Sequence, residues 1–210
     1  MPLRAPGLLL LFLAGIQAIA PQGQIAYRSI PFDTTLAIAA TPTLSIDLET
    51  GGSIRIIGGT SRVVRVHVSE RGQLCTDCAV AVTYAGTNVQ VKTRRGIPKG
   101  RSANVEVEIE VPVQSNVELS SIGGGVEIEG IDGTLSGTTQ SGALSLRRIS
   151  GTVDLQTRRG DVTLRESYVR GALRTLDGRV LFEDVGGSVV GTSAKGRVIL
   201  RRVERADSHN

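Results

Sequence analysis

The chain has 210 residues, a formal net charge of +4 and an aromatic content of only 3%, with no tryptophan. So few aromatic rings argue against a protein that stacks single-stranded nucleic acid on ring platforms. Two histidines also leave little material for general-base catalysis. The 26 glycines instead indicate many tight turns, because glycine adopts positive φ angles without a steric penalty.

Residues 1–20 have the pattern of an export signal, in which Arg4 precedes an apolar run from Leu8 to Ala20. A membrane-spanning helix needs about 20 apolar residues, and this run is shorter. We therefore expect an exported protein of the periplasm, the cell surface or the extracellular space, with no transmembrane segment beyond the signal. An uncleaved anchor is the alternative to a removed signal.

The first half of the chain alternates apolar and polar residues in several short stretches, which is typical of strands with one buried face. Residues 44–60 contain two such stretches around Gly51 and Gly52 and are predicted to form a first rung. Residues 62–112 are predicted to add strands at 64–68 and 105–111, and a hairpin whose strands flank Gly86. No amphipathic helix is expected after the signal.

The region 117–204 repeats every eighteen residues, and a glycine marks each repeat. Two and four residues after each glycine comes an apolar residue, separated by a mostly polar position. The glycines are expected at turns with positive φ, since they lead into each strand. The glycines are Gly124, Gly142, Gly160, Gly178 and Gly196, and the apolar pairs are Val126/Ile128, Leu144/Leu146, Val162/Leu164, Val180/Phe182 and Val198/Leu200.

A fixed period near 20 residues is the signature of stacked repeats that bury one another's apolar faces. The sequence therefore predicts an all-β, single-domain β-solenoid (β-helix-like) over residues 25–204. Its rungs are expected to be about 18 residues long, with a hairpin excursion near the N-terminus. Residues 205–210 are expected to form a disordered tail.

The order of these strands resembles that of the putative-adhesin family of bacterial envelope proteins, over about residues 40–204. The resemblance implies an exported domain of repeated short strands with no assigned enzyme activity, and it supplies no functional residues. It rests on the segments 44–56 (LSIDLETGGSIRI), 105–112 (VEVEIEVP) and 117–121 (VELSS), and on the glycine-to-strand repeats that follow.

Cys75 and Cys78 stand two residues apart and lie outside the pattern of that family. A redox pair at a helix N-terminus is one interpretation, but the next residues read as a strand. Structural zinc needs four ligands, and two thiolates supply half of them. A loop-closing disulfide in an oxidising compartment is the favoured interpretation.

Positive charge gathers in the C-terminal part. Residues 25–146 carry ten Lys or Arg against twelve Asp or Glu, whereas residues 147–210 carry thirteen against eight. Arg147, Arg165 and Arg201 share one rung position and are predicted to point outward as a ladder for an anionic polymer. The alternative is a solvated face in which carboxylates of neighbouring rungs neutralise them. Glu129 and Glu183 lie at the same position, and Glu166 and Asp184 lie one residue along.

No catalytic motif is present, and the carboxylates of the repeats lie singly at turns and strand ends; they are Asp154, Asp161, Glu166, Asp177 and Asp184. We therefore expect neither an enzyme nor a cofactor or metal site, and a polysaccharide-acting β-helix enzyme is disfavoured. The predicted function is an envelope interaction or adhesion module that binds a surface polymer or a protein. The alternative is a structural or sensory accessory that self-associates through its edges. Nucleic acid is not an expected partner.

Overall fold

A computed structural model describes residues 34–37, 41–70, 73–74, 80–93 and 105–205. The predicted signal, Cys75 and Cys78, and residues 206–210 lie outside the described residues. Every element is a strand, which confirms the all-β prediction, and no described segment is a helix long and apolar enough to cross a membrane. The strands are β1 Thr34–Ala37, β2 Thr43–Leu48, β3 Ser53–Gly59, β4 Val63–Glu70, β5 Gln73–Leu74, β6 Val80–Ala85, β7 Asn88–Thr93, β8 Val105–Pro112, β9 Asn116–Ser121, β10 Val126–Glu129, β11 Asp132–Ser141, β12 Leu144–Arg147, β13 Ser150–Arg159, β14 Val162–Asp177, β15 Val180–Ser193 and β16 Val198–Arg205.

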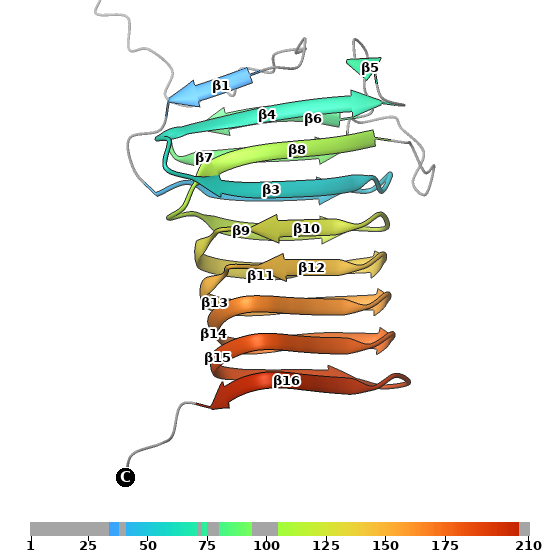
Figure 1. Cartoon of the computed structure of the whole chain (residues 1–210). Helices are drawn as coiled ribbons and strands as arrows, with labels where there is room; N and C mark the ends of the chain where they lie inside the picture. Colours follow the sequence, from blue (N-terminus) through green and yellow to red (C-terminus); the bar gives the residue numbers. More distant parts are fainter. Residues whose placement is uncertain (1–33, 38–40, 71–72, 75–79, 94–104, 206–210) are drawn as a thin grey trace, which may run out of the picture.

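All sixteen strands belong to one mostly parallel sheet that curls back on itself, so that two halves face each other (Figure 1). Half A contains β4, β8, β3, β10, β12, the first parts of β14 and β15, and β16. Half B contains β6, β7, β2, β9, β11, β13 and the second parts of β14 and β15. The antiparallel pair of β6 with β7 confirms the predicted hairpin around Gly86.

The eighteen-residue period of the sequence equals the difference in residue number between paired residues of neighbouring strands. In half A, Val126 pairs with Leu144, which pairs with Val162, and the same step continues through Val180 to Val198. In half B, β11 pairs with β13 and β13 with β14 at the same offset. Identical positions of successive repeats therefore lie in columns, as the period predicts.

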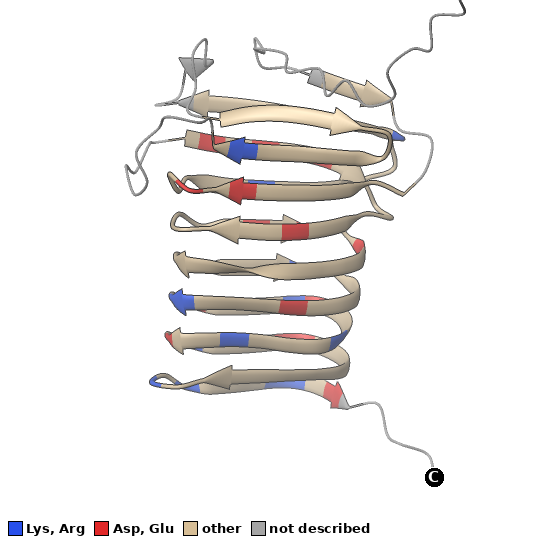
Figure 2. Cartoon of the chain, turned by 180° about the vertical axis from the view of Figure 1, so that it is seen from behind, with Lys and Arg blue, Asp and Glu red and all other residues tan. Residues whose placement is uncertain are grey.

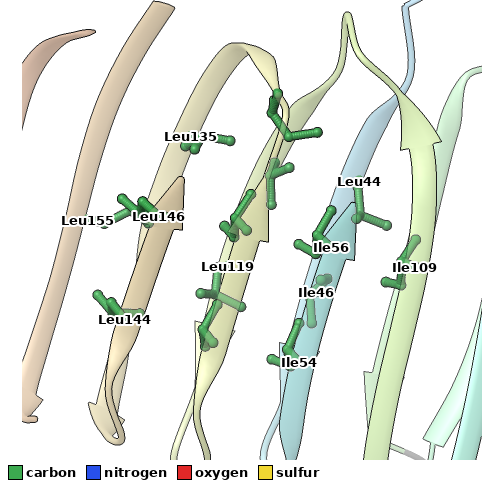
Figure 3. Packing of buried hydrophobic residues seen from close by; sticks show 14 of the residues in the cluster. Leu44, Ile46, Ile54, Ile56, Ile109, Leu119, Leu135, Leu144, Leu146 and Leu155 are labelled. Atoms are coloured by element: carbon green, nitrogen blue, oxygen red, sulfur yellow. The ribbon is translucent and has the colours of Figure 1, made fainter. Parts of the chain in front are cut away.

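The inward columns of the two halves form one core (Figure 3). Leu144 and Leu146 of half A lie close to Leu135 and Leu155 of half B, and all four side chains are buried. Each fully buried aliphatic side chain stabilises the fold by roughly 1.5–3 kcal/mol. The thin space between the halves is thus filled almost entirely by aliphatic side chains.

Near the C-terminal end, a larger side chain in half A is compensated by a smaller residue in half B. Phe182 takes a position that Leu146 and Leu164 occupy in the preceding rungs, and it is buried. Gly191 faces it from half B, where a Cβ atom would lie 2.9 Å from the Phe182 ring. The glycine therefore makes room for the larger ring, and the packing stays closed.

A column of buried or half-buried hydroxyl groups satisfies the backbone at the turns from half B into half A. The Thr175 hydroxyl donates to the Gly160 carbonyl at 2.9 Å, and the Ser193 hydroxyl donates to the Gly178 carbonyl at 2.7 Å. A buried carbonyl without a partner would be costly, so these short side chains stabilise each turn. Their column is Ser121, Thr139, Thr157, Thr175 and Ser193.

The glycines that mark the repeats lie in these turns, and positive φ is confirmed for four of them, namely Gly124, Gly142, Gly160 and Gly178, but not for Gly196. Each of the five also touches the backbone of the neighbouring rung. A Cβ atom on Gly160 would lie 2.2 Å from the Gly142 carbonyl oxygen, which no side chain permits.

The N-terminal strands do not stack in the order of the sequence. β3 lies between β8 and β10, and β2 lies between β7 and β9. The segment 44–60 is therefore enclosed by later parts of the chain. The antiparallel strands β4 and β1 lie beyond β8 in half A.

We expect Gly160→Ala to lower the free energy of unfolding by about 2 kcal/mol, because φ is +137° and the methyl group would collide with a carbonyl. Gly125→Ala is the matched control, since φ is not positive there and nothing lies within 4 Å of its added Cβ. Chemical denaturation of both variants measures the difference. Equal stabilities would remove the turn contact as a requirement of the fold.

Candidate interaction surface

The last rung of the stack exposes residues that are buried in every preceding rung. Val198 follows Val180 in its inward column, and Leu200 follows Phe182. Val180 and Phe182 are 0% and 1% exposed, whereas Val198 and Leu200 are 42% and 51% exposed. The inward columns thus end on an apolar surface at β16.

The edge of β16 adds backbone hydrogen-bonding groups to this surface. Among the described strands, β16 pairs only with β15, so its other edge has no strand partner there. The opposite end of half A differs, because antiparallel β4 and β1 follow β8. An unpaired edge is a template on which a further strand can pair.

The three arginines of the predicted ladder lie on the outer side of half A, one residue after the inward column. Each lies within 4.0 Å of a carboxylate. Arg147 contacts Glu166 at 3.0 Å, Arg165 contacts Glu183 at 3.1 Å, and Arg201 reaches Glu183 at 3.9 Å. The ladder as a binding site for an anionic polymer stays a prediction, and these pairs are the neutralisation that the sequence offered as its alternative.

A second charged column adjoins the ladder at the corner of each rung. Only its carboxylates, Glu166 and Asp184, are expected beside the ladder from the sequence. Arg148, Glu166, Asp184 and Arg202 follow one another at steps of eighteen, and all have positive φ. Arg148 contacts Glu129 at 2.5 Å, and Arg202 makes a two-pronged contact with Asp184. The left-handed corner turns two consecutive side chains outward, so simple alternation could not reveal this column.

Hydrogen bonds across neighbouring rungs shift several pKa values. The side chain of Glu166 raises the pKa of Arg147, and the side chain of Arg202 lowers the pKa of Asp184. At the turn, the side chain and then the backbone of Arg179 lower the pKa of Asp161, with contacts of 2.6–3.0 Å. Each shift favours the charged forms that hold adjacent rungs together.

The carboxylates considered for catalysis are mostly engaged in ion pairs with arginine. Asp154 pairs with Arg174, and Glu166 pairs with Arg147. Within the described ranges, no group of three or more His, Cys, Asp or Glu side chains could hold a metal ion. Glu166 and Asp184 are neighbours in the corner column, where each pairs with an arginine, but the five carboxylates do not form one shared site.

No protein-family model and no curated protein matches the sequence. The solved structures that are similar to the chain include the following two. A putative cell adhesion protein from Clostridium sporogenes ATCC 15579 has 10% identity and a TM-score of 0.42, covering 82% of this chain and 99% of its own. A putative adhesin from Parabacteroides merdae ATCC 43184 has 10% identity and a TM-score of 0.23, covering 83% and 95%.

Both descriptions agree with the family resemblance seen in the sequence. At this identity and these TM-scores, neither protein carries a role over to this chain. The functional interpretation therefore depends on the residues of the chain itself.

We expect Asp161→Asn to lower the melting temperature at pH 7 by an amount equivalent to about 0.2–1 kcal/mol, the usual size of a surface ion pair. The folded-state pKa of Asp161 is lowered, so its contribution is present above the unfolded value of about 3.9 and is lost as the pH falls through the folded value. Thermal melts from neutral to acidic pH should therefore show the two proteins converging. Asp177→Asn, on the following turn, is the control, because Asp177 has no ion pair with a described residue and its replacement should leave the melting temperature at pH 7 unchanged. A difference that stays constant with pH would contradict the ionic origin.

Proposed function

We propose that the chain is a non-enzymatic β-solenoid of the cell envelope that binds an extended segment of a protein partner at its last rung. The constant register of eighteen residues and the two facing halves support the solenoid. The signal-like residues 1–20 support export. This specifies the envelope interaction module predicted from the sequence, with a protein rather than a polymer as its ligand.

The observation that carries the proposal is the exposure of Val198 and Leu200 at the end of columns whose other members are buried. A partner strand about 4.8 Å beyond β16 would cover both side chains and pair with the free backbone groups of that edge. Addition of a strand to an exposed edge is a recurrent mode of peptide recognition, in which main-chain bonds give affinity and alternate side chains give specificity.

The charges around the edge favour an acidic partner. Arg197, Arg201 and Arg202 lie on β16 or immediately before it, and in the preceding rung Glu183 and Asp184 face the last two. A partner that continues this pattern carries apolar residues beside Val198 and Leu200 and carboxylates beside the two arginines. The same charges disfavour pairing of β16 with the β16 of another copy, the edge-to-edge alternative, because arginines would then gather at one interface.

A peptide with the sequence of residues 180–187 is a suitable probe. This segment of β15 already pairs in parallel with β16 on its other edge, from Val180 beside Val198 to Gly187 beside Arg205. It offers Val180 and Phe182 to the apolar surface and two carboxylates to the arginines. We expect the labelled peptide to bind the protein in fluorescence anisotropy, and a scrambled peptide to bind at least tenfold more weakly.

Leu200→Glu should weaken binding of the peptide about tenfold or more, because it places a charge on the apolar surface that the partner covers. Leu176→Glu is a matched control, since Leu176 is 48% exposed but lies on β14. Absence of binding, or equal affinity for the Leu200→Glu and parent proteins, would reject the last rung as the binding site.

A further inference from the structure

The outer face of half A separates its charges along the axis of the stack. Seven parallel strands form this face, in the order β8, β3, β10, β12, β14, β15 and β16, with β12 in the middle. Antiparallel β4 extends it beyond β8. Figure 2 shows the molecule from behind, with half B in front. There, long uncharged stretches separate the charged positions along each strand.

The two ends of this face carry equal and opposite charge. The four strands before β12 hold five carboxylates and two guanidinium groups, a net of −3. From β12 to β16, counting the turn residue before each strand, the face holds five guanidinium groups and two carboxylates, a net of +3. The first set is Arg55, Arg65, Glu106, Glu108, Glu110, Glu127 and Glu129, and the second is Arg147, Asp161, Arg165, Arg179, Glu183, Arg197 and Arg201.

The centre of the face is lined by small side chains. Ala143 and Ser145 lie at β12, and Gly125 and Ser53 occupy the corresponding place in the neighbouring rungs. Together with Arg55 and glutamates of β8 and β10 they line a shallow hollow of about 540 Å³ that extends from β12 to β8. A second surface can therefore approach the backbone closely at the middle, while charged side chains reach across at the ends.

We propose that a second copy of this chain binds this face in the opposite orientation, about a two-fold axis that runs parallel to the strands at β12. This operation reverses the order of the rungs and preserves the position along each strand. It sets Glu106 opposite Arg197 of the second copy and Glu110 opposite Arg201 of the second copy. Each contact occurs twice, because a two-fold interface is self-complementary.

The charges nearer the axis are compatible with the same arrangement. β10 comes to face β14 of the second copy, which sets Glu129 opposite Arg165. Arg147 faces its own equivalent across the axis, and there Glu166 at 3.0 Å and Glu129 at 4.0 Å hold its charge within each copy. Ala143 and Ser145, which lie beside the axis, carry no charge to be desolvated.

A second copy fits this face better than an anionic polymer does. A polyanion would be attracted by the basic end and repelled by the acidic end, so that the net attraction over the whole face is small. A reversed copy brings opposite charges together at both ends of the face and between β10 and β14, whereas β3 and β15 set Arg55 opposite Leu181 and add no ion pair. Because the paired groups are exposed, the association is weak and depends on salt.

The test exchanges charges between two variants. One carries Glu106→Arg and Glu110→Arg, and the other carries Arg197→Glu and Arg201→Glu. Sedimentation equilibrium at about 50 mM salt should show the parent approaching twice its monomer mass with rising concentration and returning to the monomer mass at about 500 mM. Each variant alone should remain a monomer, because like charges then meet at both ends. An equimolar mixture should recover the dimer, since every contact again joins an arginine to a glutamate.

Asp47→Arg with Glu118→Arg is the matched control, because it makes the same change of charge on half B and should leave dimerisation intact. Circular dichroism of each variant separates loss of association from loss of folding. A parent that stays monomeric at low salt, or a mixture that does not associate, would overturn the proposal. The Leu200→Glu protein should still dimerise, so this result stands or falls independently of peptide binding at β16.

Discussion

The close contact between each turn and the turn of the neighbouring rung determines the geometry of the whole stack. At five successive turns, a Cβ atom on the marking glycine would lie 1.8–2.2 Å from the carbonyl oxygen of the adjacent glycine. Only a hydrogen atom fits there, which allows a Cα–H to carbonyl contact. Backbone hydrogen bonds hold successive turns together, as from the Gly142 N–H to the Arg159 carbonyl at 2.8 Å and from the Gly160 N–H to the Asp177 carbonyl at 2.9 Å. Because larger residues do not fit in this contact, every later position falls into the same column. The apolar core, the hydroxyl column and the charged corner column all follow from that alignment.

The same alignment explains why the two ends of the molecule differ. A column needs a neighbour on each side to bury its side chains, and the final members of a column have only one. At the N-terminal end, antiparallel β4 covers the side of β8 that would otherwise be free. At the C-terminal end, β16 has the inward residues of an interior rung without a described strand beyond it. The surface proposed for partner binding thus has the sequence pattern of an interior rung but lies at the end of the described stack.

Much of this structure could be predicted from the sequence. In a stack of equal rungs, the length of the sequence repeat fixes which residues of neighbouring strands pair. The spacing of Gly124 to Gly196 sufficed to place Val126, Leu144 and Val162 in one column. Alternation likewise placed Arg147 and Arg165 on the outside. It failed at Arg148 and Asp184, where positive φ turns a second consecutive residue outward. It also could not show that β3 lies between β8 and β10, since that order depends on pairing between segments far apart in the chain.

That out-of-order arrangement divides the chain into two parts with different assembly histories. β2 and β3 lack one of their neighbours until residues 116–129 are available, because β9 and β10 complete their pairing. The N-terminal part therefore closes late and through contacts of long sequence separation, which makes its formation slow. Once β10 is in place, each further eighteen residues find a finished edge and add to it by local contacts. A chain synthesised from its N-terminus would thus remain incomplete until about its first 130 residues are available, and would then assemble rung by rung.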